Sequence, residues 1–328
     1  MKSFIVVTSI YPPTKAIKSF AQLHEHELIV VGDKKTPDSW KCENVHFLST
    51  EQQSGLPYQL IKYLPFNHYC RKMLGYLKAM DQNAEVIIDT DDDNYPKANW
   101  SFPALENKYD CIEPNQGFVN IYQCYSDQHI WPRGLPLNLV KKDFQLDKLI
   151  KPKQCKVGIW QGLADEDPDV DAIYRITNDR PCRFQERSPV VLGKGTTCPF
   201  NSQNTLIRKE LYPLLYLPIS VTFRFTDILR GIVAQPVMWS CDYLLGFNEA
   251  TVVQKRNPHD YLKDFESEVP MYLHGKRSFD IACETVSRSM NISDNLYQVY
   301  RALAKEKIVE EMELISLEAW LKDVSKHG

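Results

Sequence analysis

The sequence predicts a mixed α/β fold, GT-A-like (Rossmann-like) in class, with a mostly parallel sheet flanked by helices and a helical extension at the carboxyl end. In the first hundred residues, short runs of aliphatic and β-branched residues alternate with amphipathic stretches, which is typical of βαβ units. Several of these runs end in polar residues, as strands do at the edge where an open sheet binds ligands. Residues 286–328 show apolar positions three or four apart, which predicts helices.

Composition narrows the classes of protein to consider. The chain has 328 residues, of which 43% are hydrophobic and 25% charged, enough for one large domain with a substantial core. A net charge of -3 gives no indication of a nucleic-acid partner. Nine cysteines without a C-x-x-C pair indicate reduced thiols in a cytoplasmic protein. No stretch is long and apolar enough to predict a transmembrane segment.

The first strands and helices bring polar residues to one crevice. Strands are expected at residues 3–9, 26–31 and 45–48, and helices at residues 15–23 and 67–80. Thr8 and Asp33 would then lie at the carboxyl ends of neighbouring strands, where Asp33 could accept hydrogen bonds from a base or a ribose. The alternative for Asp33 is a turn-forming role beside Gly32.

Two adjacent basic residues stand near the start of the 67–80 helix. Arg71 and Lys72 are candidates for binding a diphosphate, and Arg71 fits better because its planar fork matches phosphate oxygens. A solvated helix face is the alternative, and we favour it for Lys72.

The stretch from Glu85 to Pro96, EVIIDTDDDNYP, is the strongest functional signal. Its apolar run predicts a strand buried on both faces, and four carboxylates follow within five residues: Asp89, Asp91, Asp92 and Asp93. Carboxylates this close repel one another unless a cation neutralises them, and oxygen ligands of this kind suit Mg²⁺ or Mn²⁺ together with a diphosphate. The spacing fits both Asp89-x-Asp91 and Asp91-x-Asp93. We expect Asp91 and Asp93 at the metal, with Asp89 or Asp92 nearer the ribose; a solvated acidic turn is the alternative.

Two runs in this region carry a family resemblance, Arg71 to Tyr76 (RKMLGY) and Ile87 to Asp93 (IIDTDDD). They resemble the core of the STELLO-type glycosyltransferase-like proteins. More distantly they resemble the plant reversibly glycosylated polypeptides, which include UDP-arabinopyranose mutases. Further similar blocks lie at residues 161–177, 223–231 and 256–272, so the resemblance extends from Thr8 to about Tyr272.

The resemblance implies a GT-A-like fold whose Asp-x-Asp motif binds a divalent metal and the diphosphate of a nucleotide sugar. A late histidine completes the metal shell in many GT-A enzymes, so His259, which lies in a similar block, is expected as a third ligand beside Asp91 and Asp93. A structural or surface role is the alternative for a lone histidine. Arg256 is a candidate partner for the diphosphate. Plant STELLO-type proteins also carry a membrane anchor and further domains, which we do not expect here.

Polar residues later in the chain are candidates for binding the acceptor or the donor sugar. An acidic cluster contains Asp165, Asp167 and Asp169, and a helix is expected over residues 170–176 with Asp167 or Asp169 as its cap. The remaining aspartates, with Asn201 of a polar loop, could hydrogen-bond sugar hydroxyls. Surface charge is the alternative reading of this cluster.

The segment FRFTDILR, residues 223–230, is the candidate catalytic segment. Arg224, Asp227 and Arg230 are three residues apart and would share one helix face. Apolar neighbours, Phe223 among them, indicate burial, where charges must be paired or used in chemistry. Asp227 could then act as a general base towards an acceptor hydroxyl, and a surface ladder of ion pairs is the alternative.

Together these features predict a metal-dependent glycosyltransferase that moves a sugar from a UDP donor to a hydroxyl of a glycan or lipid-linked acceptor, in surface polysaccharide or glycan synthesis. A UDP-sugar pyranose/furanose mutase and a non-catalytic nucleotide-sugar-binding protein are the alternatives. Residues 1–285 are expected to form the catalytic domain. Residues 286–328 would pack on it or on a second subunit of a homo-oligomer. We expect a cytoplasmic protein, with peripheral contact at the inner face of a membrane as an alternative.

Overall fold

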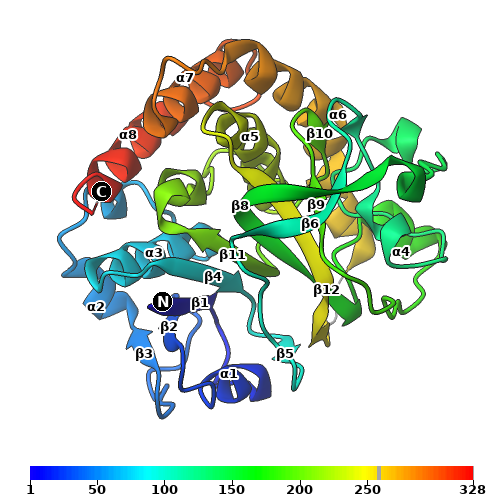
Figure 1. Cartoon of the computed structure of the whole chain (residues 1–328). Coiled ribbons are helices and arrows are strands. Elements are labelled where there is room, and N and C mark those ends of the chain that lie inside the picture. The colour runs from blue at the N-terminus through cyan, green and yellow to red at the C-terminus, as the bar shows by residue number, and fades with distance from the viewer. Residues whose placement is uncertain (257–259, 328) are drawn as a thin grey trace.

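The computed structural model describes residues 1–256 and 260–327 of the chain. Within them, one ten-stranded sheet has the order β3-β2-β1-β4-β11-β8-β6-β9-β12-β5, with a further pairing between β8 and β12 (Figure 1). Its strands are β1 (Ser3–Thr8), β2 (Glu27–Val31), β3 (His46–Leu48), β4 (Val86–Thr90), β5 (Asn94–Pro96), β6 (Glu106–Ile112), β8 (Ile150–Glu166), β9 (Val190–Leu192), β11 (Asn204–Arg208) and β12 (Leu244–Gln254). The short strands β7 (Gly117–Phe118) and β10 (Thr196–Thr197) pair separately.

Helices cover both faces of this sheet and form the carboxyl-terminal part of the described chain. The α-helices are α1 (Lys15–Phe20), α2 (Thr50–Ser54), α3 (Lys72–Asp81), α4 (Ala172–Thr177), α5 (Thr226–Ser240), α6 (Tyr261–Thr285), α7 (Ile292–Lys305) and α8 (Met312–Val324). The 3-10 helices are η1 (Gln59–Lys62), η2 (Tyr69–Arg71), η3 (Ile121–Cys124), η4 (Leu137–Leu139), η5 (Leu146–Leu149) and η6 (Lys209–Leu215). The prediction of a mixed sheet flanked by helices, with helices at the carboxyl end, is confirmed.

Parallel pairing forms one continuous block in the first strands, and it recurs in this sheet between β6 and β9 and between β8 and β12. β3, β2, β1 and β4 run parallel, whereas β11 lies antiparallel between β4 and β8. The first strands were predictable because each is a short, nearly continuous apolar run. The long strand β8 was not, because its first half is polar and exposed and its second half ends in the acidic cluster.

Two hydrophobic cores lie on the two faces of the sheet. Alternate residues of β1 point to opposite faces, so Val6 packs in the core that includes α3 while Val7 packs in the core that includes α1. Gly75 explains how closely α3 approaches the strands: a Cβ there would lie 2.6 Å from Cγ1 of Val6 and 2.8 Å from Cγ2 of Val31. The glycine in the RKMLGY run therefore serves helix-to-sheet packing.

The carboxyl-terminal helices share the core on the α3 face. Leu296, Val299 and Leu303 of α7 and Trp320 of α8 are buried in it. Figure 1 shows α7 and α8 running along one side of the molecule, with α8 ending near α3. The division at residues 285/286 stays a prediction. In the described part of the chain, no helix is both long and apolar enough to cross a bilayer.

Candidate active site

Two adjoining clefts open at the edge of the sheet where β1 and β4 end. The larger has a volume of about 260 Å³ and the second about 210 Å³. Both are lined by Thr8, Tyr69, Asp92 and Phe223, so the clefts meet at these residues. β1 and β4 are parallel neighbours, which is why polar residues following each strand face one crevice.

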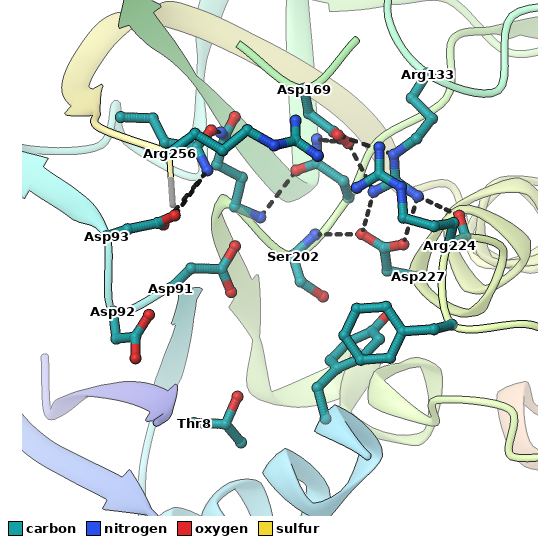
Figure 2. A pocket seen from close by; sticks show the side chains of 15 residues that line it. Thr8, Asp91, Asp92, Asp93, Arg133, Asp169, Ser202, Arg224, Asp227 and Arg256 are labelled. Atoms are coloured by element: carbon teal, nitrogen blue, oxygen red, sulfur yellow. Dashed lines mark hydrogen bonds and ion pairs between the residues drawn. The ribbon is translucent and has the colours of Figure 1, made fainter. Parts of the chain in front are cut away.

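The acidic loop after β4 lies in the larger cleft, as Figure 2 shows for Asp91, Asp92 and Asp93. Hydrogen bonds hold each carboxylate differently. Lys72 Nζ donates to Asp91 Oδ1 at 3.1 Å, and Ser9 Oγ donates to Asp92 Oδ2 at 2.5 Å. Gln254 Nε2 lies 3.3 Å from both oxygens of Asp93, which brings the end of β12 to the loop. The alternative interpretation, a solvated acidic turn, therefore does not fully account for this loop.

These three carboxylates have raised pKa values. About 40% of the Asp91 side chain remains accessible, yet desolvation deep in the cleft raises its pKa to about 6 against the opposing effect of Lys72. Burial likewise raises the pKa of Asp92 to about 6, and burial together with the charge of Asp92 raises the pKa of Asp93 to about 6. Burial is the largest cause of each raised pKa and the neighbouring carboxylates add to it, so the chain by itself does not fully compensate the negative charge here.

A fully buried ion cluster lies beneath the acidic loop. Asp89 Oδ1 accepts from Lys72 Nζ at 2.8 Å, and Asp89 Oδ2 accepts from Arg230 Nη1 at 2.9 Å. Burial alone would raise the pKa of Asp89, but these two cations outweigh it and lower the pKa. All three side chains are buried and none of them lines either cleft. The expected solvated face for Lys72 is thus wrong, and the expected contacts of Asp89, Lys72 and Arg230 with a ligand are not supported by their positions.

The other end of the larger cleft is organised by Arg133, which sequence reasoning missed. Its guanidinium contacts both oxygens of Asp169 at 2.8 Å and both oxygens of Asp227, at 3.0 and 3.2 Å. Arg133 also donates to the backbone oxygen of Arg224. The signal that could have found it is an arginine within the otherwise apolar run Ile130 to Leu135.

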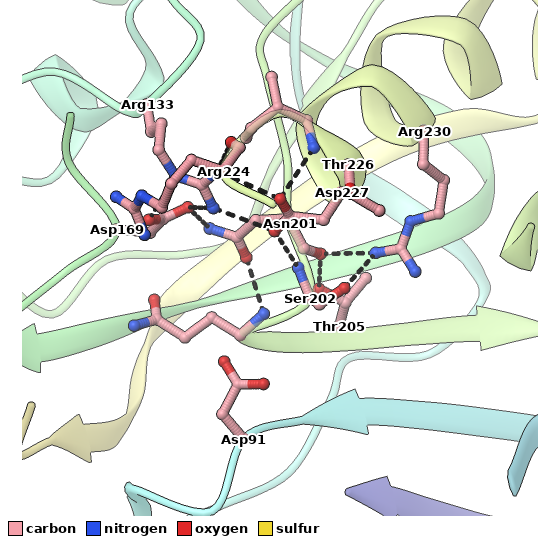
Figure 3. Close-up of polar contacts among 12 residues, drawn as sticks. Asp91, Arg133, Asp169, Asn201, Ser202, Thr205, Arg224, Thr226, Asp227 and Arg230 are labelled. Atoms are coloured by element: carbon pink, nitrogen blue, oxygen red, sulfur yellow. Dashed lines mark hydrogen bonds and ion pairs between the residues drawn. The ribbon is translucent and has the colours of Figure 1, made fainter. Parts of the chain in front are cut away.

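The polar loop before β11, which contains Asn201 and Ser202, connects the Arg133 cluster to the buried ion cluster beneath the acidic loop. Arg133 and Arg230 lie on its two sides (Figure 3). Asn201 Nδ2 donates to Asp169 Oδ2 at 2.7 Å. Arg230 Nη2 donates to the backbone oxygen of Asn201 at 3.1 Å and to Ser202 Oγ at 3.0 Å. Burial alone would raise the pKa of Asp169, but Arg133 outweighs it and holds the pKa below its usual range.

The candidate catalytic segment differs from expectation in two respects. α5 begins at Thr226, so Arg224 lies before the helix and does not share a helix face with Asp227 and Arg230. Phe223, expected to be buried, is 52% exposed and lines both clefts. Asp227 lines the larger cleft but is paired with Arg133 rather than with Arg224 or Arg230.

Arg224 and Arg256 also line the larger cleft. Arg224 Nε and Nη2 both donate to Oε1 of Glu268, at 3.0 and 2.8 Å. Arg256 Nη2 lies 3.3 Å from Asp264 Oδ2. In Figure 2 the guanidinium of Arg256 lies near Asp169 and Arg224, and its charge also acts on Asp93, whose pKa it lowers against the larger effect of burial.

The second cleft carries the remaining predicted nucleotide-binding residues, Asp33 and Arg71. Asp33 accepts hydrogen bonds from the backbone nitrogens of Lys34 at 2.7 Å and His68 at 3.2 Å. It therefore stabilises the local turn and also lines the second cleft. Arg71 is held by Gln53 Oε1 at 2.7 Å and stacks on Phe66 at 4.1 Å from the ring centroid.

Two predicted acceptor residues are absent from both clefts. Asp165 pairs with Lys97 at 2.6 Å, and Asp167 pairs with Arg175. The expected cap of the following helix is also wrong: Asp171 caps α4, with its side chain accepting from Tyr174 N. Because Asp171 caps α4, the side chain of Asp169 is not used in the cap, and it lines the larger cleft paired with Arg133.

The donor chemistry of the acidic loop fits Mg²⁺ or Mn²⁺, because Asp91 and Asp93 offer carboxylate oxygens beside an open cleft. Among the residues that the structure describes, no group of three or more histidine, cysteine, aspartate and glutamate side chains is arranged to hold a metal ion. Mg²⁺ commonly takes only one or two carboxylates and completes its shell with water and phosphate. The predicted third ligand, His259, lies outside the described residues.

Comparison with known proteins supports the resemblance seen in the sequence. The model of the family of STELLO glycosyltransferases matches residues 224–328. The chain is 28% identical to the probable glycosyltransferase STELLO1 and 27% identical to the probable glycosyltransferase STELLO2, both of Arabidopsis thaliana. Each match covers 100% of this chain but 45% of the relative, so the chain spans about half the length of these relatives. The resemblance to STELLO-type proteins is confirmed.

Solved structures give a weaker likeness. Glucosyl-3-phosphoglycerate synthase of Mycobacterium tuberculosis, in complex with Mg²⁺ and UDP, matches with a TM-score of 0.39 and 10% identity over 84% of this chain and 79% of that one. The same enzyme in complex with phosphoglyceric acid matches with a TM-score of 0.38 and 11% identity over 85% and 78%. Scores this low support no inference about this chain.

Proposed function

We propose that this protein is a metal-dependent glycosyltransferase of the GT-A type that uses a UDP-sugar donor. The observation that carries the proposal is the position of Asp91, Asp92 and Asp93 in the larger cleft, next to where the second cleft joins it. The likeness to probable glycosyltransferases along the whole chain supports it. A cytoplasmic location and a role in glycan synthesis belong to the same proposal.

The donor would extend through both clefts. Asp33 would accept hydrogen bonds from the base or ribose in the second cleft. Arg71 and Thr8, which also line this cleft, would contact the same nucleotide. Asp91 and Asp93 would hold Mg²⁺ or Mn²⁺ where the clefts meet, and such an ion stabilises the negative charge on a departing diphosphate. Lys72 orients Asp91 for this role through its 3.1 Å hydrogen bond.

The acceptor would lie at the other end of the larger cleft, near Asp169 and Asp227. Asp227 is the candidate base because its carboxylate lies at this end, within the cleft lining. Both of its oxygens already accept from Arg133, so an acceptor hydroxyl must approach beside that guanidinium. Arg133 and Asn201 hold Asp169 and thereby shape the acceptor end.

The test is thermal unfolding with a panel of nucleotides and nucleotide sugars, each with and without Mn²⁺. We expect UDP and a UDP-sugar to raise the melting temperature only when Mn²⁺ is present, because a ligand that binds the folded state stabilises it. Stabilisation by UDP without metal, or none with any nucleotide, would contradict the proposal.

Incubation with the stabilising UDP-sugar then separates the activities. Release of UDP with formation of a glycosylated product is expected. A ring isomer of the intact UDP-sugar would instead identify the mutase. For the base role, Asp227→Asn should bind UDP normally yet lower turnover by roughly 10²–10⁴-fold, and unchanged turnover would remove Asp227 from the reaction.

A further inference from the structure

Three arginines gather at the end of the larger cleft that is farther from the acidic loop (Figure 2). They differ in what their guanidiniums already bind. Arg133 donates from Nε, Nη1 and Nη2 to Asp169 and Asp227, so its hydrogen bonds are used within the chain. Arg133 is therefore a structural centre of this end rather than a ligand-binding group.

Arg224 is fixed by one carboxylate of α6, and its guanidinium still lines the larger cleft. Its Nε and Nη2 share the single oxygen Oε1 of Glu268. Glu268 is fully buried, and its other oxygen accepts from Ala172 N at 2.7 Å and from Tyr272 Oη at 2.6 Å. The carboxylate thus fixes the arginine from α6, and within the described chain Nη1 of Arg224 has no hydrogen-bond partner.

Arg256 has an unsatisfied buried donor. Its side chain is only 8% exposed, and its Nε makes no hydrogen bond with any residue that the structure describes. The contact of its Nη2 with Asp264, at 3.3 Å, is long for a charge-assisted hydrogen bond. A buried N–H without a partner is costly, and an oxyanion from a ligand would satisfy it.

The charges around Arg256 also favour an anionic ligand at this position. Burial first, and then the charges of Arg224 and Arg175, lower the pKa of Arg256. Two guanidiniums brought together in a shielded place therefore destabilise each other's charge. Asp169 faces them, but its oxygens already accept from Arg133 and Asn201.

We propose that Arg224 and Arg256 bind an oxyanion on the acceptor, a carboxylate or a phosphate monoester, so that the acceptor is an acidic or phosphorylated molecule. The forked guanidinium recognises both groups. This inference rests on the proposed function, since it assigns the cleft to a donor and an acceptor. It reassigns Arg256 from the donor diphosphate, where the sequence placed it, to the acceptor.

The arrangement of the clefts favours the acceptor as the source of the anion. A donor that enters through the second cleft reaches the larger one at Thr8, Tyr69 and Asp92. The carboxylates of Asp91 and Asp93, with a cation, would then meet its diphosphate at this junction. The charges of Arg224 and Arg256 both act on Asp169, on the side of Asp227, and that of Arg256 also reaches Asp93.

The experiment measures binding of two anionic probes, glucose 6-phosphate and glucuronate, against neutral glucose by calorimetry. Each probe is titrated into the protein alone and into the protein saturated with UDP and Mn²⁺. We expect at least one anionic probe to bind at least tenfold more tightly than glucose, with UDP and Mn²⁺ already bound. The tighter of the two probes identifies the class of anion.

Variants assign the binding to the two arginines. Arg256→Gln and Arg224→Gln should weaken the anionic probe at least tenfold while UDP with Mn²⁺ still binds. Arg256→Lys, which keeps the charge, should restore part of the affinity. Arg277→Gln, at an exposed arginine of α6 paired with Glu306, is the matched control and should change nothing.

Three results would overturn the proposal. The first is competition between the anionic probe and UDP, with Arg256→Gln weakening UDP, because the arginines would then belong to the donor. The second is equal binding of anionic and neutral probes, and the third is unchanged anion affinity in both glutamine variants. Failure of the proposed function is separate, because it appears as no binding of UDP with Mn²⁺ to the unaltered protein.

Discussion

Asp91, Asp92 and Asp93 are adjacent in the sequence but differ in what holds them. Asp91 contacts a lysine, Asp92 a serine hydroxyl and Asp93 a glutamine amide. One oxygen of Asp91 is engaged by Lys72, while the side chain lines the larger cleft and remains about 40% accessible. We therefore expect the charge of Asp91 to matter most for the proposed binding of a cation.

Replacing Asp91 by asparagine tests this role. Asp91→Asn should abolish the Mn²⁺-dependent stabilisation by UDP and lower any transfer activity on the order of a hundredfold or more, because one charged ligand is lost. The fold should persist, since Lys72 keeps Asp89 and the backbone oxygen of Thr90 as partners. Thermal unfolding with and without Mn²⁺ is the measurement.

The control for that variant is Asp143→Asn, at an exposed aspartate that lines neither cleft. It should retain the full effect of Mn²⁺ and UDP. Normal turnover in Asp91→Asn would remove Asp91 from the metal site.

The raised pKa values of the acidic loop predict a pH dependence of metal binding. The pKa of each carboxylate is about 6 in the metal-free fold, above the ordinary value of 3.8, so the folded state takes up protons more readily than the unfolded chain. These groups therefore make the metal-free protein less stable as pH rises from about 4 to about 6. Mn²⁺ needs the deprotonated carboxylates, so its stabilising effect should be present above pH 6 and disappear as pH falls through about 6.

The measurement is the difference in melting temperature with and without Mn²⁺, taken from about pH 5 to about pH 7.5. Taking the difference removes other titrating groups, such as His26 and His68, whose pKa values are lowered by burial. A Mn²⁺ effect that is equally large at both ends of this range would contradict the prediction.

At the scale of elements, the site depends on how α5 packs against the loop before β11. Gly231 lies in α5, and a Cβ there would lie 2.3 Å from the backbone oxygen of Phe200. The next residues of the loop, Asn201 and Ser202, make the contacts with Asp169 and Arg230. We therefore expect a displacement of the helix to disturb the end of the larger cleft that Asn201, Ser202 and Asp169 line.

Gly231→Ala should destabilise the protein by about 1–3 kcal/mol, because the added methyl group meets backbone that cannot move aside without disturbing the loop. The matched control is Gly275→Ala in α6, where the nearest atom is Ile232 Cδ1 at 3.5 Å. That change should be neutral or stabilise by about 0.5–1 kcal/mol, the usual gain from alanine in a helix. Urea unfolding measures both, and equal effects of the two variants would refute the packing argument.

At the scale of the whole molecule, two buried carboxylates of α8 bind two segments of the chain that are far apart in the sequence. Near its start, the buried Glu313 accepts from Tyr216 Oη and from the backbone nitrogens of Ile219 and Ser220, at 2.9 and 2.7 Å. Near its end, Asp323 accepts from Leu60 N at 2.9 Å. The first contact holds the segment that leads to Phe223 and Arg224, so the carboxyl-terminal helices support the site.

Glu313→Gln should lower the free energy of unfolding by about 1–3 kcal/mol, because the amide keeps one acceptor oxygen and turns an N–H group towards backbone donors. We also expect weaker binding at the arginine end of the cleft, since residues 219–224 would be less well fixed. Glu318→Gln, at an exposed position on the same helix, should change stability by no more than about 0.5 kcal/mol. Denaturant unfolding measures both variants, and a Glu313 variant as stable as the control would contradict this role.

Much of the first half of the fold could be predicted from the sequence. The strands at residues 3–8, 27–31 and 86–90 are short apolar runs, and burial on both faces leaves such runs few other conformations. The acidic loop could be predicted too, because carboxylates crowded after a buried strand require compensation wherever the rest of the chain lies.

Which charges meet could not be predicted, because the pairs are far apart in the sequence. Arg230 was expected beside Asp227, its neighbour in the chain, yet it pairs with Asp89. Arg133 pairs with Asp169 and Asp227, and no local pattern encodes either contact.

The sequence by itself determined the class of the fold and the position of the acidic loop, since both follow from local hydrophobicity and local charge. Only the tertiary structure decided which carboxylates face the cleft and which are neutralised beneath it. The physical reason is that a charge's role depends on its solvation and its partner, and both are set by packing between distant segments.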